Sequence, residues 1–187
     1  MTDPVRARLG RLLRERSVRT GEFTLSSGAR STFYVDARRT TFNGEGQALV
    51  GRVALAALDR LGWAPALVGG LTLGADPVAC AIAHTAALGG RPLDAFTVRK
   101  EPKEHGTACR IEGGTVNDAD VVVVEDVVTT GESALRAIRA VEEEGARVIG
   151  VLALVDRQEG GRERIEAAGH ALEALFTAAE LTASGQG

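Results

Sequence analysis

The sequence predicts an α/β fold, with a central, mostly parallel sheet, helices on both of its faces and a small additional element at the N-terminus. Two observations support this prediction. Strand and helix patterns alternate along most of the chain, and the central strand patterns at 65–70, 120–125 and 147–155 are continuous apolar runs. Such runs are typical of parallel strands that are buried on both faces. Because 187 residues suffice for one sizeable core, we expect residues 1–187 to form a single domain.

The N-terminal forty residues predict a helix followed by two short strands. Asp3 and Pro4 are typical of an N-cap and a first helical turn, and apolar residues recur at helical spacing up to Leu13, so we expect a helix over 4–16. The segments "GEFTLSSG" (21–28) and "STFYVDAR" (31–38) predict the two strands, which surround a Ser-Gly-Ala turn.

The middle of the chain predicts two helices and two strands. Asn43 can cap a long helix that Gly62 would end, and the strand at 65–70 is followed by an apolar helix over 74–88 in which Cys80 is expected to be buried. A strand over 93–100 leads into a polar segment, Glu101 to about Asn117, with no apolar period. Long loops in compact domains are usually functional or disordered, so we expect an exposed functional loop here.

The C-terminal part predicts a regular alternation of strands and helices. The expected elements are a strand at 120–125, a helix at 132–144 stopped by Gly145, a strand at 147–155, a helix at 159–168, a strand near 170–176 and a short final helix.

Charge, cysteine content and hydropathy indicate which partners the protein can bind and in which compartment it is expected. The net charge is −3 and the isoelectric point about 5.7, which gives no general affinity for nucleic acid or an anionic membrane. Only two cysteines occur, a usage that favours a reducing compartment. The arginine-interrupted N-terminus lacks the apolar segment of a signal peptide, and no apolar run is long enough to span a membrane. We expect a cytoplasmic protein with no nucleic-acid or membrane partner.

The segment "VVVVEDVVTTGES" (121–133) carries the clearest chemical signal. Ligands of open α/β sheets bind beyond the carboxyl ends of the strands, which is where Glu125 and Asp126 lie. The loop from Thr129 to Ser133 offers hydroxyls and free backbone N–H groups at a helix start, which suit a phosphate. Carboxylates that accept hydrogen bonds from a diol, next to a phosphate loop, describe a site for a ribose 5-phosphate. A P-loop NTPase is excluded because no GxxxxGK[ST] loop occurs.

Lysine usage singles out a second segment. Of 22 basic residues only Lys100 and Lys103 are lysine, and both lie in "RKEPKEHGT". A site that needs a compact ammonium group would explain this choice.

These segments resemble a known family. "VVVVEDVVTTGES" is similar to the phosphoribosyl-pyrophosphate (PRPP) binding motif of type I phosphoribosyltransferases. The segments "FTLSSGARSTFYVDARR" (23–39), "FTVRKEPKEHGT" (96–107) and "LVDRQEGG" (154–161) resemble orotate phosphoribosyltransferases. The resemblance covers at least Gly21 to Gly161.

The resemblance implies an activity. Such enzymes transfer the 5-phosphoribosyl group from PRPP to orotate, giving orotidine 5′-monophosphate and pyrophosphate, in pyrimidine nucleotide biosynthesis. It implies a Mg²⁺ ion held mainly through PRPP, with no dedicated protein ligands. It also implies a homodimer in which a mobile catalytic loop, here 100–117, reaches the partner's site, and a hood formed by residues 1–40.

The resemblance also assigns roles to residues. The catalytic cations would be Arg99, Lys100, Lys103 and His105. PRPP would be bound by Glu125, Asp126, Val127, Val128, Thr129, Thr130, Gly131, Glu132 and Ser133. Orotate would be bound by Arg157, Tyr34 and Thr129, because a planar guanidinium suits a planar anion.

The chain departs from many relatives at basic positions. Ser26 stands where many have a lysine, and "LTLG" (71–74) stands where many have a Tyr-Lys pair, which removes a cation expected near the pyrophosphate. Glu125 replaces the commoner aspartate, and Glu104 places an acid inside the cationic loop.

Two other functions remain open on the same fold. One is a phosphoribosyltransferase for another base, against which the loop and Arg157 argue, because neutral purines offer an arginine no carboxylate. The other is a non-catalytic, PRPP-sensing regulator that binds nucleic acid. Such a regulator should carry a basic face, whereas these arginines are scattered and the net charge is negative.

Overall fold

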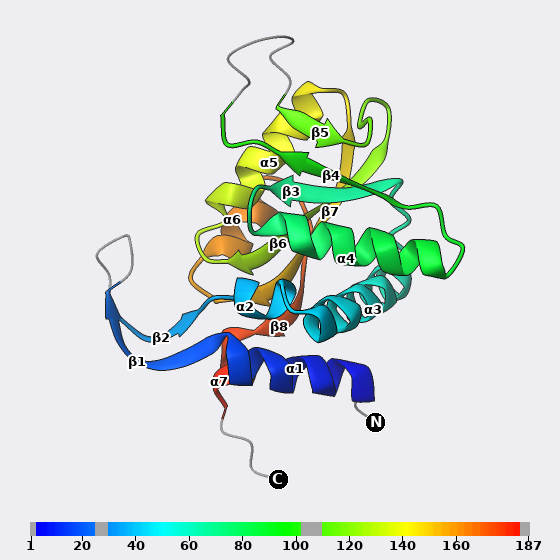
Figure 1. The fold of residues 1–187 in the computed structure, drawn as a ribbon. Helices are drawn as coiled ribbons and strands as arrows, with labels where there is room; N and C mark the ends of the chain where they lie inside the picture. Colours follow the sequence, from blue (N-terminus) through cyan, green and yellow to red (C-terminus); the bar gives the residue numbers. More distant parts are fainter. Residues whose placement is uncertain (1–2, 25–29, 102–109, 184–187) are drawn as a thin grey trace.

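A computed structural model describes residues 3–24, 30–101 and 110–183 (Figure 1). Their core is a six-stranded sheet with the strand order β5-β4-β3-β6-β7-β8. The strands are β3 (Leu67–Leu71), β4 (Asp94–Val98), β5 (Ile111–Gly113), β6 (Asp120–Val128), β7 (Arg147–Asp156) and β8 (Leu172–Thr177). All neighbours pair in parallel except the edge strand β5, which runs antiparallel to β4. The predicted α/β class is confirmed.

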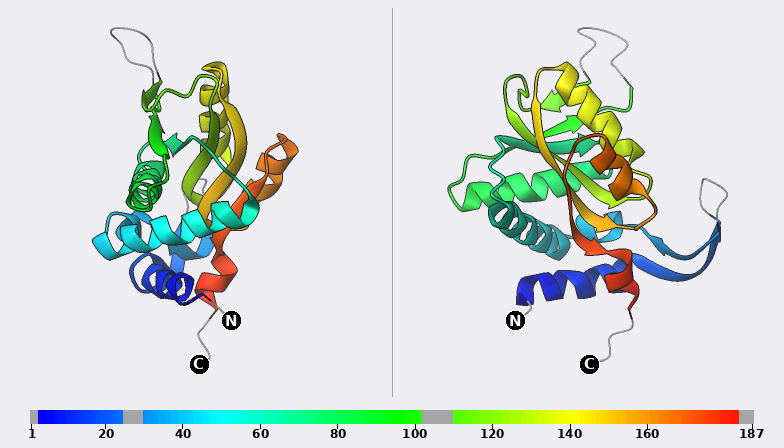
Figure 2. Two further views of the ribbon diagram at one scale, coloured as in Figure 1. Left: turned by 90° about the vertical axis from the view of Figure 1, so that its right-hand side faces the viewer. Right: turned by 180° about the vertical axis from the view of Figure 1, so that it is seen from behind.

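Helices cover both faces of this sheet, as Figures 1 and 2 show. On one face lie α3 (Gly44–Leu61) and α4 (Ala75–Leu88), and on the other α5 (Glu132–Glu143) and α6 (Gly161–Ala167). The valines of β6 alternate between the two layers. Val122 and Val124 pack in the cluster beneath α3 and α4, whereas Val121 and Val123 pack in the cluster beneath α5. This alternation decides where the acids that follow the valines point.

The N-terminal residues form a helix and a separate hairpin. Helix α1 (Pro4–Arg16) begins as predicted, since the Asp3 carboxylate accepts a hydrogen bond from the Val5 N–H at 2.9 Å. Strands β1 (Val18–Thr24) and β2 (Arg30–Val35) pair antiparallel and project from the body of the molecule (Figure 1). A short helix, α2 (Arg38–Thr41), then returns the chain to the core.

One buried hydrogen bond holds the base of this hairpin. The hydroxyls of Ser17 and Thr40 lie 2.7 Å apart and are both buried, which joins the start of β1 to α2. This contact fixes the hairpin to the core, and residues of the hairpin share a cavity with the carboxyl ends of β6 and β7.

The caps of α3 confirm the sequence signals. The Asn43 side chain accepts a hydrogen bond from the Gly46 N–H at 3.1 Å, and Gly62 ends the helix with a φ of 68°. Glycine adopts this left-handed conformation without the steric cost that a side chain would add. After β8 a short helix, α7 (Ala178–Thr182), completes the described chain.

Two expectations were wrong. The polar segment after β4 is not irregular up to Asn117, because residues 111–113 form β5 and both Ile111 and Val116 are buried. Cys80 is exposed on α4 rather than buried. In the described ranges, no helix is both long enough and apolar enough to cross a membrane.

Candidate active site

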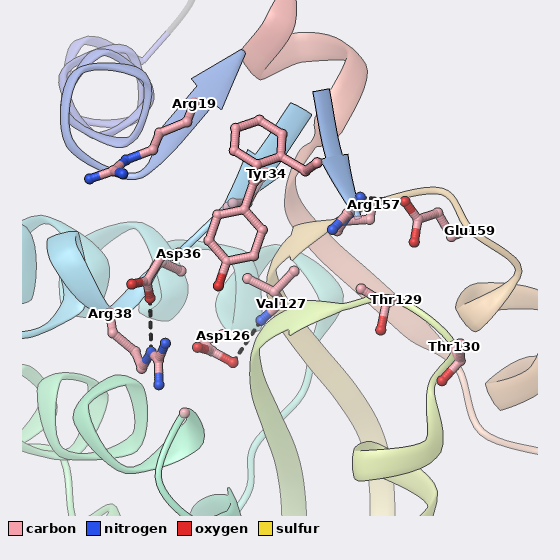
Figure 3. A pocket seen from close by; sticks show the side chains of 14 residues that line it. Arg19, Tyr34, Asp36, Arg38, Asp126, Val127, Thr129, Thr130, Arg157 and Glu159 are labelled. Atoms are coloured by element: carbon pink, nitrogen blue, oxygen red, sulfur yellow. Dashed lines mark hydrogen bonds and ion pairs between the residues drawn. The ribbon is translucent and has the colours of Figure 1, made fainter. Parts of the chain in front are cut away.

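A cavity of about 970 Å³ opens between the hairpin, α2 and the carboxyl ends of β6 and β7. Figure 3 shows its lining side chains, and the lining residues come from four separate parts of the chain. The lining residues are Arg19, Phe23, Tyr34, Val35, Asp36, Ala37, Arg38, Gly74, Asp126, Val127, Thr129, Thr130, Arg157 and Glu159. This volume is ample for a phosphorylated sugar and a base.

The structure places the two acids of β6 on opposite faces of the sheet. Asp126 lines the large cavity, and its carboxylate accepts a hydrogen bond from the Val127 N–H at 2.9 Å. Glu125 is buried and instead lines a small pocket of about 30 Å³ beneath the loop that follows the strand. In this structure Asp126 alone of the two faces the large cavity, so a ribose contact from Glu125 remains a prediction.

Gly74 lies directly against Asp126. A Cβ atom at this position would lie 2.4 Å from Oδ1 of Asp126, which is closer than a side chain can approach. The glycine therefore leaves the space that the carboxylate occupies, at the point where β3 gives way to α4.

Burial raises the pKa of both acids. Removal from water, together with the nearby charge of Asp126, raises the pKa of Glu125 to about 8. Burial also raises the pKa of Asp126, although the Val127 N–H and Arg38 oppose this effect. One Glu125 carboxylate oxygen has no hydrogen-bond partner among the described residues. The raised pKa is consistent with a carboxyl group that is poorly compensated in this state.

The loop after the acids has the geometry of an anion site. Gly131 has a φ of 74° and precedes α5, so the N–H groups of the first turn of α5 are available to a ligand. Thr129 and Thr130 line both the large cavity and the 30 Å³ pocket, while Ser133 lines only the pocket. A Cβ at Gly131 would lie 2.9 Å from the carbonyl oxygen of Gly161, so the loop is packed tightly on α6.

The remaining predicted PRPP residues differ in accessibility. Val128 is buried in the core, and Glu132 is exposed and pairs with Arg164 at 2.6 Å. Both line the 30 Å³ pocket. Val128 offers its backbone there rather than an accessible side chain.

The three predicted orotate residues lie together in the large cavity. Arg157 is 5% exposed, and its guanidinium carbon lies 4.8 Å from the centre of the Phe33 ring. Its Nη2 donates a hydrogen bond to Glu159 at 2.5 Å. Tyr34 and Thr129 line the same space (Figure 3). A guanidinium stacked on an aromatic ring has a fixed plane, which suits it to a planar anion.

Two of the predicted catalytic cations, Arg99 and Lys100, lie outside this cavity. Arg99 and Lys100 line a second cavity of about 620 Å³ with Thr72, Thr97, Glu101 and Glu112, and Arg99 donates to Glu112 at 2.8 Å. Within the described chain these two cations do not meet Asp126 in one cavity. Lys103 and His105 lie outside the described residues.

Several lining residues were missed from the sequence. Glu159 follows the carboxyl end of β7, where site residues are expected, whereas Arg19 lies at the start of β1 and Arg38 begins α2. Among many arginines, no sequence pattern separates Arg38 from its exposed neighbour Arg39.

Comparison with known proteins shows the family to which this chain belongs. The family described as phosphoribosyl transferase domain matches residues 50–170. The orotate phosphoribosyltransferase of Aquifex aeolicus is 48% identical over 179 residues, covering 94% of this chain and 97% of that protein. The chain belongs to the orotate phosphoribosyltransferase family. A further member, from Mycobacterium avium, is 48% identical over 181 residues, covering 97% and 98% of the two chains.

A solved structure of the family extends the match to three dimensions. The orotate phosphoribosyltransferase of Mycobacterium tuberculosis H37Rv, crystallised in complex with PRPP, superposes with a TM-score of 0.81 at 45% identity, covering 95% of this chain and 99% of that one. The family resemblance found in the sequence motifs is confirmed, and with it the type I phosphoribosyltransferase fold.

Proposed function

We propose that this protein transfers the 5-phosphoribosyl group of PRPP to orotate, giving orotidine 5′-monophosphate and pyrophosphate in de novo pyrimidine biosynthesis. The observation that carries this proposal is one cavity that holds Asp126, Arg157 and the first two residues of the phosphate loop, Thr129 and Thr130. These groups match a ribose diol, a 5′-phosphate and an anionic base in turn. The likeness to curated orotate phosphoribosyltransferases supports the choice of base.

The residues would divide the substrates between them. The loop from Thr129 to Ser133 would hold the 5′-phosphate, and Asp126 would accept hydrogen bonds from the ribose hydroxyls. Arg157 would meet the orotate carboxylate from the Phe33 side of the cavity, with Tyr34 beside it. PRPP and orotate would thus be fixed with their reacting atoms adjacent, which removes much of the entropic barrier.

The chemical step exchanges one bond at the anomeric carbon. The bond from C1 to the pyrophosphate oxygen would break as C1 bonds the orotate ring nitrogen, and the proton of that nitrogen would pass to the leaving pyrophosphate or to solvent. Negative charge builds on the leaving pyrophosphate. Arg99, Lys100, Lys103 and His105 are proposed to stabilise it, because cations aimed at developing charge lower the barrier most effectively.

The donor set of the cavity suits magnesium. Among the residues that the structure describes, no group of three or more His, Cys, Asp or Glu side chains could hold a metal ion. Mg²⁺ commonly uses only one or two carboxylates together with substrate phosphates, and Asp36 and Asp126 both line the cavity. When bound with PRPP, Mg²⁺ would supply charge neutralisation for the phosphates.

We further propose a homodimer in which residues 100–117 of one protomer complete the site of the other, and a hood formed by residues 1–40. The separation of Arg99 and Lys100 from the cavity of Asp126 supports the shared site, since the cations must reach the pyrophosphate from elsewhere. A cytoplasmic location is proposed because the chain has only two cysteines and Cys80 is a free thiol.

A direct assay of base consumption tests the proposed function. Orotate absorbance is followed with PRPP and Mg²⁺, and in parallel reactions lacking either one. We expect loss of orotate only when all are present, with no turnover of adenine, hypoxanthine or uracil. Turnover of a purine would identify another phosphoribosyltransferase. PRPP binding without turnover, accompanied by a PRPP-dependent gel shift of nucleic acid, would identify a regulator.

A further inference from the structure

The side chain of Arg38 has no role in the function described so far, yet it lies in the same cavity. It leaves the first position of α2, and its Nε donates a hydrogen bond to Oδ1 of Asp36 at 2.8 Å. Figure 3 shows its guanidinium beside the carboxylate of Asp126, and the charge of Arg38 acts to lower the pKa of that acid. Within the described part of the chain, the terminal nitrogens of Arg38 donate no hydrogen bond.

Arg38 and the residues that are proposed to bind the 5′-phosphate lie on opposite sides of Asp126. In Figure 3 Thr129 and Thr130, from the phosphate loop, lie on one side of Asp126, and Arg38 lies on the other. A ribose held through its hydroxyls at Asp126, with its 5′-phosphate in that loop, directs its C1 substituent away from the loop. In PRPP this substituent is the diphosphate, so its negative charge would come to the side of Arg38.

A second feature marks the same side as favourable for an anion. Gly74 lines the cavity there, and the 14-residue helix α4 begins directly after it at Ala75. The free N–H groups and the positive end of a helix dipole attract negative charge within the first turn. Arg38 and the start of α4 thus reach the same region from separate parts of the chain.

Arg38 is also held in place before any ligand binds. Its Nε is committed to Asp36, and its side chain is half exposed, so the two terminal nitrogens remain available in a fixed fork. A guanidinium fork of this kind matches the geometry of phosphate oxygens. Arg19, the other exposed arginine that lines the cavity, has no comparable anchor among the described residues.

We propose that Arg38 binds the diphosphate of PRPP, from the side of Asp126 opposite the phosphate loop. This inference rests on the proposed function. It also accounts for a feature of the sequence: the cations absent at Ser26 and in the "LTLG" segment are replaced in this chain by a guanidinium that the fold brings in from α2.

Binding measurements with two ligands test the assignment. Calorimetry in the presence of Mg²⁺ compares PRPP with ribose 5-phosphate, which lacks the diphosphate, for the wild type, Arg38→Gln and Arg39→Gln. Arg39 is the matched control, because it is an exposed arginine of the same short helix that does not line the cavity. Arg38→Gln should bind PRPP roughly 10- to 100-fold more weakly, as expected for the loss of charge-assisted hydrogen bonds. Its affinity for ribose 5-phosphate should stay within about threefold of the wild type.

The controls separate binding from structure. Arg39→Gln should bind both ligands as the wild type does, and Arg38→Lys should recover part of the PRPP affinity because it keeps the charge. Equal weakening of both ligands by Arg38→Gln would show that Arg38 only positions Asp126, and an unchanged PRPP affinity would show that it does not touch the diphosphate. Either result overturns the proposal.

The same experiment distinguishes failure of this inference from failure of the proposed function. No orotate is present in the binding cell, so a PRPP-specific loss in Arg38→Gln stands even if the wild type consumes a different base. Conversely, wild-type turnover of orotate together with an unaltered Arg38→Gln variant would refute the role of Arg38 and leave the function intact.

Discussion

Replacing Glu125 by glutamine should change how the stability of this protein depends on pH. Burial raises the pKa of the Glu125 carboxyl from 4.5 to about 8, with Asp126 as the second cause. Because the folded-state pKa lies above the unfolded value, the stabilising contribution of the proton is fully present below about pH 4.5. It declines as the pH rises and is lost by about pH 8.

The magnitude follows from this difference in pKa. Each unit corresponds to about 1.4 kcal/mol, so the ionised Glu125 carboxyl costs about 5 kcal/mol of folding free energy relative to the protonated form. Glutamine has nearly the same shape and no titrating proton. The free energy of unfolding of Glu125→Gln, relative to the wild type, should therefore rise by about 2 kcal/mol between about pH 6 and pH 8 and level off above about pH 9.

Urea unfolding followed by circular dichroism at several pH values measures this difference. Glu143→Gln provides the control, since it removes an exposed carboxyl from the end of α5 and should leave the pH dependence unchanged. A difference between Glu125→Gln and the wild type that stays constant across this range would refute the reasoning. It would mean that the pKa of Glu125 lies below this range, because some other group stabilises the ionised carboxylate.

Three other predictions concern the reaction itself. Lys103→Ala should lower kcat by at least about 100-fold while PRPP still binds, because the proposed role of Lys103 is to stabilise charge on the leaving group. Unchanged turnover in a stopped assay would show that Lys103 has no part in the mechanism. If each site takes residues from two chains, mixing Lys103→Ala protomers with Asp126→Asn protomers should restore part of the activity. Mixed dimers that form but remain inactive would show that each site is built within one chain. Gly74→Ala should weaken PRPP binding about tenfold or more, because the new Cβ would lie 2.4 Å from Oδ1 of Asp126 and displace that carboxylate. An affinity equal to that of the wild type, measured by calorimetry, would show that Asp126 can move without loss of PRPP binding.

Local sequence signals predicted most elements of the fold. The Asn43 cap, the Gly62 stop and the valine run of β6 each act within a few residues, and the structure places all three as expected. Strand β5 was missed because its sequence carries no such local signal. Its three residues contain a single buried apolar side chain, Ile111, and they become a strand only through pairing with β4 in the folded sheet.

The candidate site was predictable where it lies on one continuous segment. Asp126 and the loop that is proposed to hold the phosphate belong to one strand and the turn after it, so a motif could point to them. The alternation of side chains in β6 could also have separated Glu125 from Asp126 in advance. Arg38 could not be found in this way, because its place beside Asp126 depends on how the hairpin and α2 return to the sheet.

The central claim is that the cavity at the ends of β6 and β7 joins PRPP to orotate. Its most direct test is to incubate the wild type and Asp126→Asn with orotate, PRPP and Mg²⁺, and to quantify orotidine 5′-monophosphate and pyrophosphate by mass spectrometry and a phosphate assay. We predict equal amounts of the two products from the wild type and a strongly reduced yield from the variant. Pyrophosphate release without the nucleotide, or full activity in Asp126→Asn, would contradict the claim.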